Sequence, residues 1–234
     1  MTDNSVPGPT LVETTAKFLR DAILRGEYPP GVSLPEIPLS KELNVSRGAV
    51  REALRTLSET GLVVLSPRHG AEVCSVSPQL IHEVYTLRAV LEAFAVKLAI
   101  TSGHMNGEAL RGVEAAYEGL VAAVESEDKA AMIEADMAFH WAVCSPCGHE
   151  LLLEHLRQLQ ARTCLCILYT KVHASDAESE ALSHRPILNA VISGEADRAE
   201  AALRDHLISA GHRLLVRMTS SESPRGRRTK KRTP

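Results

Sequence analysis

The 234-residue sequence predicts a mainly α-helical protein built from two parts that meet near residue 77. Aromatic residues make up only 3% of the chain while alanine and leucine abound, a composition that favours packed helices over sheets. Apolar residues recur at helical spacing through most of the chain. One β-prone stretch, at 62–76, interrupts this pattern, and only helical patterns follow it.

The first part has the pattern of three helices followed by a hairpin. The apolar periodicity of the first helix begins at Leu11 and ends at a Gly and a Pro-Pro-Gly turn. A short helix, "PLSKELNV", follows with Pro38 in its first turn and is broken at Asn44. Ser46 is a good N-cap for a third helix, "SRGAVREALRTLSETG", which Gly61 ends.

Two β-prone runs around residues 66–70 complete an N-terminal winged helix-turn-helix, in which the third helix enters the major groove of DNA. On that helix Arg47, Arg51 and Arg55 recur every four residues, opposite an apolar face. The planar fork of arginine can grip guanine or phosphate with two hydrogen bonds. A charged row on a helix is more often a solvated face, but its place between a turn and a basic hairpin favours DNA contact.

The second part, residues 78–218, predicts a C-terminal all-α helical bundle of about six helices joined by short connections, so that neighbours pack antiparallel. The helical patterns cover 78–102, 107–126, 128–145, 149–171, 176–194 and 195–218. With the winged helix at 11–76, this leaves a flexible N-terminus at 1–10 and a basic tail at 219–234. The tail ends in "PRGRRTKKRTP", which contains no acid and predicts disorder; it serves either to attract phosphate or to aid solubility.

Composition places the protein in the cytoplasm. No apolar run approaches the roughly 20 residues that span a bilayer, and the N-terminus lacks the features of a signal peptide. A thioredoxin-type reading of "CSPC" needs a βαβ context that the sequence lacks, and a four-cysteine zinc site is the other alternative. Buried, reduced thiols are favoured for all five cysteines, namely Cys74, Cys144, Cys147, Cys164 and Cys166.

The stretch "EADMAFH" places Asp136 and His140 on one face of a predicted helix. They can be a surface pair, a buried hydrogen bond or half of a metal site. Two later helices carry His184 and His206. One carboxylate and three imidazoles would suit a divalent ion, but spacing alone does not bring three helices together.

Two segments, "LNVSRGAVREALRTLSETGLV" and "SPRHGAEV", resemble the DNA-binding domain of GntR-type bacterial transcription regulators over about residues 11–76. Gly48 and Ala49 depart from that pattern, since they replace the usual Thr-Pro or Thr-Thr and so remove a hydroxyl that often bonds phosphate. The resemblance implies a set of DNA-contacting residues on the third helix and the wing tip: Ser46, Arg47, Arg51, His69 and Gly70.

"DMAFH" and "SHRPILNAVISGEADRAEAALRDH" resemble the FCD effector domain that accompanies this winged helix. The resemblance implies a divalent metal ion, zinc first with nickel or manganese as alternatives, that holds a small organic acid. It also implies Arg88 of "YTLRAVLE" as a second grip on that anion. The alternative for Arg88 is a salt bridge to Glu92 within one helix. The implied ligands are Asp136, His140, His184 and His206.

Three functions follow from these patterns. The leading one is a homodimeric repressor that binds a palindromic double-stranded operator under the control of a small carboxylate effector. The second is a metal-responsive regulator in which the ion itself is the signal. The third is a metallohydrolase, which is disfavoured because no further acid or base lies near the four ligands and an enzyme has no need of a winged helix. We therefore expect no enzyme activity and no membrane partner.

Overall fold

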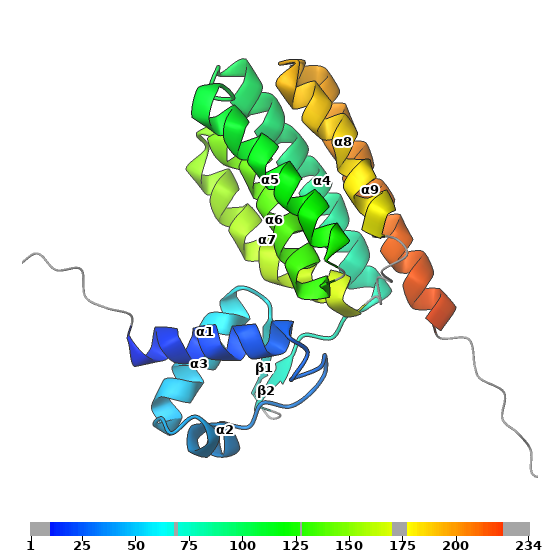
Figure 1. Cartoon of the computed structure of the whole chain (residues 1–234). Helices are drawn as coiled ribbons and strands as arrows, with labels where there is room; N and C mark the ends of the chain where they lie inside the picture. Colours follow the sequence, from blue (N-terminus) through cyan, green and yellow to red (C-terminus); the bar gives the residue numbers. More distant parts are fainter. Residues whose placement is uncertain (1–9, 68–69, 127, 170–176, 222–234) are drawn as a thin grey trace, which may run out of the picture.

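The computed structural model describes residues 10–67, 70–126, 128–169 and 177–221. The predicted wing-tip residue His69 and most of the two predicted terminal segments, 1–10 and 219–234, lie outside these ranges. The described elements confirm a mainly helical chain, with a winged helix-turn-helix at one end of a helical bundle (Figure 1). Among the described helices, none combines the length and the apolar composition needed to cross a bilayer.

The winged part follows the predicted order of elements. Thr10 and Glu13 form a capping box at the start of the first helix, and Ser46 caps the third by accepting a hydrogen bond from the backbone of Ala49. Gly61 follows the third helix with φ +70°, a conformation that glycine adopts without strain. The elements are α1 (Leu11–Leu24), α2 (Glu36–Glu42), α3 (Arg47–Glu59), β1 (Val63–Ser66) and β2 (Gly70–Val73).

Two details of this part were not predicted. Helix α2 begins at Glu36, two residues before the predicted start, so that Pro38 still lies in its first turn. The hairpin pairs Val63 with Val73 in antiparallel register, and an isolated bridge from Ser33 to Glu72 extends it. The bridge places the segment before α2 alongside the hairpin.

The bundle also follows the predicted pattern. Helix α4 packs against α9, α7 and α6, and α5 packs against α6 and α8 (Figure 1). Helix α9 continues to Ser221, three residues into the segment predicted as a tail. The elements are α4 (Pro78–Thr101), α5 (Gly107–Glu125), α6 (Lys129–Cys144), the 3₁₀ turn η1 (Ser145–Cys147), α7 (Glu150–Tyr169), α8 (Ala177–Ile192) and α9 (Ala196–Ser221).

The buried apolar residues form two clusters, one within the winged helix and one within the bundle. Helix α7 is common to both: Leu156 lies in the bundle cluster, whereas Leu165, fully buried, lies in the cluster of the winged helix. The end of α7 therefore joins the two cores, a contact between residues far apart in sequence that periodicity does not predict.

Candidate metal centre

Three imidazoles from three different helices meet inside the bundle. His140 lies on α6, His184 on α8 and His206 on α9, and all three are buried. One nitrogen from each ring can be chosen so that the three lie within 4.8 Å of one another. Among the described residues this is the only group of three or more His, Cys, Asp or Glu side chains with metal-ligand spacing.

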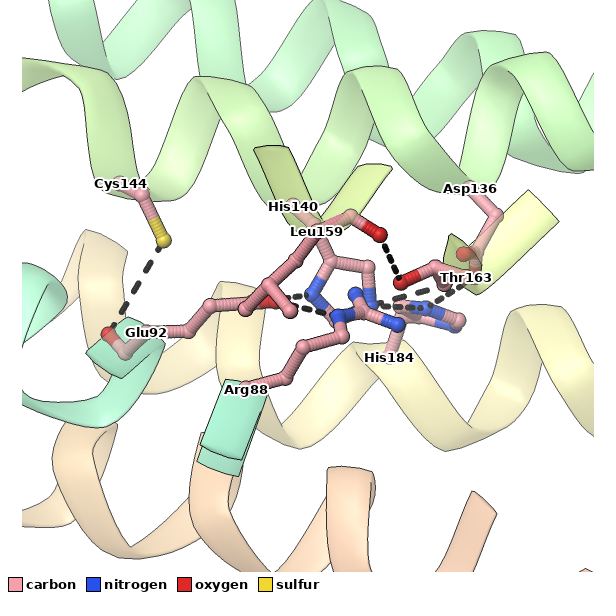
Figure 2. Close-up of polar contacts among 8 residues, drawn as sticks. All are labelled: Arg88, Glu92, Asp136, His140, Cys144, Leu159, Thr163 and His184. Atoms are coloured by element: carbon pink, nitrogen blue, oxygen red, sulfur yellow. Dashed lines mark hydrogen bonds and ion pairs between the residues drawn. The ribbon is translucent and has the colours of Figure 1, made fainter. Parts of the chain in front are cut away.

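Asp136 lies beside two of these rings, one helical turn before His140 on α6. Its Oδ1 atom is 3.1 Å from Nε2 of His184 and 3.9 Å from Nε2 of His140. Figure 2 shows the carboxylate and both rings directed to the same point between the helices. The structure thus brings together the four residues implied as ligands, and their role as ligands stays a prediction.

A fifth residue, Glu92 on α4, orients the cluster. Its carboxylate accepts a hydrogen bond from Nδ1 of His140 at 2.6 Å, and both side chains are almost completely buried (Figure 2). Because an ionised carboxylate can only accept, Nδ1 of His140 carries a proton, and in the neutral imidazole Nε2 then keeps its lone pair. Metal-binding histidines are commonly held by such a bond from the second ring nitrogen.

The donor set fits a divalent cation. The lone pair of His140 Nε2 lies 3.3 Å from Nε2 of His184, close to the ionised Asp136. With bonds of about 2.0–2.2 Å to zinc, two ligand atoms on one ion lie roughly 3–4 Å apart, as these three atoms do. Imidazole nitrogens and one carboxylate oxygen are ligands that zinc, nickel and manganese accept.

The pKa values of Asp136 and His206 are shifted toward the forms that bind a cation. Burial disfavours the charged form of Asp136, but nearby His140, His184 and Arg88 more than offset this, so the pKa of the carboxyl lies well below its usual range. Burial, together with the two neighbouring imidazoles, lowers the pKa of His206 well below its ordinary value. His206 is therefore neutral, the form in which histidine binds a metal.

Arg88 takes part in a buried ion pair, the alternative left open for it by the sequence. Its Nε atom is 2.6 Å from Oε1 of Glu92, and the same carboxylate holds His140 through its other oxygen. Burial opposes the charge on Glu92, yet Arg88 and His140 hold its pKa at about 2. Arg88 and Glu92 also line a cavity of about 30 Å³ beside His140 and Trp141, space on the order of one or two water molecules.

On the winged helix, three of the five predicted DNA-contacting residues line one groove. Arg47 and Arg51 of α3 and Gly70 of the hairpin line a hollow of about 690 Å³ between α2, α3 and β1. The hydroxyl of Ser46 is engaged in capping α3. Sequence reasoning missed Glu36 at the start of α2, which holds Arg51 through two hydrogen bonds of 2.8 Å each.

None of the five cysteines forms a disulfide within the described part of the chain. Cys144, Cys147 and Cys166 are buried, and Cys74 and Cys164 are partly buried. Burial raises the pKa of the Cys166 thiol to about 12 and that of Cys164 to about 11, which keeps both protonated at neutral pH. Of the candidate cysteine roles, this arrangement matches the buried thiols that the sequence favoured.

The chain is similar to named transcription regulators over both of its parts. The HTH-type transcriptional repressor GlaR of Escherichia coli K12 is 30% identical over 200 residues, which cover 82% of this chain and 90% of that protein. A protein of Paenarthrobacter nicotinovorans named as a probable D-xylose utilization operon transcriptional repressor is 28% identical over 200 residues, which cover 85% and 86% of the two chains. These relatives are transcription regulators and not enzymes.

Solved structures share the fold. The crystal structure of a GntR-type transcriptional regulator from Rhodococcus sp. RHA1 superposes with a TM-score of 0.76 and 27% identity, over 88% of this chain and 97% of that one. Residues 11–73 match the family of bacterial regulatory proteins of the gntR type, and residues 83–209 match the FCD domain. The chain therefore belongs to the GntR family of DNA-binding transcription regulators, in the group that carries an FCD domain.

Proposed function

We propose that this regulator is a repressor whose operator binding is controlled by a small organic acid held at a divalent metal ion in the bundle. One contact supports this function above all. Glu92 accepts the Nδ1 proton of His140 at 2.6 Å in a fully buried site, which leaves the Nε2 lone pair aimed at His184 and Asp136. That arrangement is costly to bury unless a cation completes it.

Asp136, His140, His184 and His206 would hold the ion, with zinc as the first choice. When bound, the ion supplies a Lewis-acid position at which a carboxylate can bind. The charges of Arg88 and Glu92 cancel, and Asp136 offsets half the charge of a divalent ion, so the site carries a net charge of about +1. A small anion is the ligand that such a site favours.

Arg88 is the second group available to an anionic effector. Its guanidinium donates from Nε to Glu92 and has four further N–H donors. Arg88 also lines the cavity that His140 and Thr163 line. Because that cavity holds only on the order of one or two water molecules, an organic acid must displace side chains as it enters. Such a rearrangement is what an effector needs in order to favour one conformation over another.

The small cavity also favours a second function, a metal-responsive regulator in which the ion itself is the signal. The residues needed to bind the ion are already in contact, whereas space for an acid has to be made. The two functions differ in what changes operator affinity. In the leading one the acid does so while the metal stays bound, and in the second metal occupancy alone does so.

Helix α7 is the route by which the site would reach the winged helix. Leu159 lines both the cavity beside His140 and a cleft between the hairpin and the bundle. Three residues further on, the guanidinium of Arg162 lies against Gly61, at the end of α3. A shift of α7 at the site is thus transmitted to the DNA-contacting helix through direct contacts.

Homodimerisation belongs to the same proposal. Winged helices of this kind bind palindromes, whose symmetry a two-fold protein dimer matches. On α4, Leu87, Val90 and Phe94 lie on one face and are each about half exposed, which leaves an apolar stripe for a second copy. We expect light scattering to give twice the chain mass, and Phe94→Glu to reduce it to the mass of one chain. A wild-type monomer bound to operator would contradict this.

Thermal unfolding of the purified protein tests the site. Midpoints are measured with zinc, with chelator, and with zinc plus a panel of sugar acids, hydroxy acids and dicarboxylates. We expect zinc to raise the midpoint, one class of acid to raise it further, and both effects to vanish in His184→Ala. His155→Ala is the matched control because His155 is exposed on α7 and, among the residues that the structure describes, hydrogen-bonds only the carbonyl of Leu151. A response to zinc with none to any acid supports the metal sensor, and no response to zinc contradicts both functions.

A further inference from the structure

Glu36 is an acidic residue within the surface proposed to face DNA, where its negative charge opposes the binding of phosphate. It is the first residue of α2 and lines the same groove as the three arginines of α3, Arg47, Arg51 and Arg55. DNA presents one phosphate charge for about every 1.7 Å of helix axis, so an acid in such a groove weakens binding unless it is neutralised.

The contacts of Glu36 neutralise it and fix one arginine. Its Oε1 accepts from Nε of Arg51 and its Oε2 from the terminal Nη2 of Arg51, both at 2.8 Å, and Nη2 of Arg47 lies 3.9 Å from Oε2. Arg51 is 61% exposed, whereas Glu36 is 28% exposed. The carboxylate is thus the anchored partner, on a helix whose Leu39 is buried, and the arginine is the one held.

The geometry of this pair leaves one edge of the Arg51 guanidinium available to bind a base. Guanidinium has five N–H donors, and Glu36 engages the edge formed by Nε and one proton of Nη2. The two terminal nitrogens keep an outward-facing pair of donors, the pair that matches O6 and N7 of guanine. A free arginine must lose about 2 kcal/mol of side-chain entropy to adopt one geometry, and the bidentate contact with Glu36 removes that freedom beforehand.

We infer that Glu36 is a positioning residue that holds Arg51 for sequence-specific contact with one base pair of each half-site. This inference rests on the proposed role of Arg51 in DNA binding. It assigns to Glu36 a function in specificity instead of affinity, since its charge opposes phosphate contact while its hydrogen bonds orient the reading side chain. Arg55, for which the described contacts include no ion pair, is left for phosphate contact.

Glu52 offers a matched control for the charge of Glu36. It is an exposed acid on α3, next to Arg51 in sequence, and lines the same groove. No ion pair of its side chain is found among the described residues. Glu36→Gln and Glu52→Gln therefore each remove one negative charge from the DNA-facing surface, but only the first disrupts the support of Arg51.

The test begins by selecting a half-site from randomised duplex DNA with the wild-type protein. Affinities of wild type, Arg51→Ala, Glu36→Gln and Glu52→Gln are then measured for every single-base change. We expect Arg51→Ala to abolish discrimination at one position and Glu36→Gln to lower it there by on the order of 10-fold. Glu52→Gln should bind all duplexes more tightly and leave discrimination unchanged.

Salt dependence separates positioning from a merely structural role. Once released in Glu36→Gln, Arg51 becomes available to phosphate, so the slope of log affinity against log salt should steepen by about 0.9, the value for one added phosphate contact. Equal discrimination in the two glutamine variants overturns the inference about Glu36 and leaves Arg51 in place. If Arg51→Ala affects no base position, the inference fails together with the assigned role of Arg51.

Discussion

Two Arg–Glu ion pairs of this protein lie in opposite settings. Arg88 and Glu92 pair inside the bundle with 4% of each side chain exposed, and Arg51 and Glu36 pair on the winged helix with 61% and 28% exposed. Water screens the second pair and not the first. The buried pair is therefore expected to act through stability and the order of the candidate metal site, whereas the exposed pair lies on the surface proposed to face DNA.

The difference also appears in what each pair holds. Glu92 uses its second oxygen to fix His140, so the buried pair is one end of a network that continues to Asp136 and His184 (Figure 2). Beyond Arg51, the ion pairs found for Glu36 in the described part of the chain add a second arginine, Arg47, 3.9 Å away. Changing one member of the buried network alters contacts that link α4, α6 and α8, whereas changing Glu36 alters its contacts with two exposed arginines of α3.

The largest expected effect is on the buried pair. Glu92→Gln keeps the shape of the side chain but leaves the charge of Arg88 buried without a counter-charge, which costs about 3–5 kcal/mol of folding free energy. Glu36→Gln should leave the free energy of unfolding unchanged within error. Urea denaturation in the presence of chelator measures both without a contribution from metal. Similar losses in the two variants would abolish the contrast between the two regions.

The two ion pairs should also differ in how much stability they contribute at acid pH. Arg88 and His140 outweigh burial and lower the pKa of Glu92 from 4.5 to about 2. A depressed carboxyl pKa stabilises the folded state above the unfolded pKa, and that contribution is lost as pH falls toward the folded one. We therefore expect the Glu92 contribution, about 3 kcal/mol from this shift, to be lost between about pH 5 and pH 2.

The measurement is urea denaturation of the metal-free protein at a series of pH values. The curve for Glu92→Gln should be flatter than that for wild type across the acid range, because the variant has no carboxyl to protonate at this position. The curve for Glu36→Gln should run close to that of wild type. If the wild-type and Glu92→Gln curves are parallel, Glu92 is not held in its charged form by Arg88 and His140.

The order of the elements could be predicted because its signals are local. Ser46 and Gly61 lie at the ends of α3, within a few residues of the contacts that they make. Apolar spacing predicted all the bundle helices to within a few residues. The start of α2 was misplaced because Pro38 is an equally good first-turn residue whether the helix begins there or at Glu36.

The polar contacts could not be predicted in the same way because they cross long stretches of chain. Glu92 and His140 are 48 residues apart, and Glu36 and Arg51 are 15 apart on different helices. Periodicity places each residue on a face of its own helix and gives no rotation of one helix against another. The meeting of His184 with His140 was implied only by family resemblance, and Glu36 had no signal beyond its position before an arginine-rich helix.

A smaller effect concerns the surface arginines themselves. Arg51→Ala should lower operator affinity on the order of 10- to 100-fold if its guanidinium reads a base, and Arg47→Ala should do likewise. Arg55→Ala should lower affinity for all sequences alike and reduce the salt slope by about 1. Fluorescence anisotropy at several salt concentrations measures both quantities. Unchanged operator affinity in Arg47→Ala and Arg51→Ala would remove α3 from the DNA contact, whatever the behaviour of Arg55.

The smallest expected change concerns the contact that joins the two regions. The guanidinium of Arg162 on α7 lies at Gly61, where the backbone carbonyls of α3 end, so its charge interacts favourably with the helix dipole. Arg162→Gln should therefore cost about 0.3–1 kcal/mol of stability.

The more informative readout is the ratio of operator affinities with zinc and with chelator. If α7 carries the signal, this ratio falls toward one in Arg162→Gln while zinc still stabilises the protein, because the metal site is untouched. Arg157→Gln, on the same helix against Trp141, is the matched control and should keep the wild-type ratio. Suppose that this ratio differs from one in the wild type and is unchanged in Arg162→Gln. The candidate metal site and α3 would then communicate by a route that does not use Arg162.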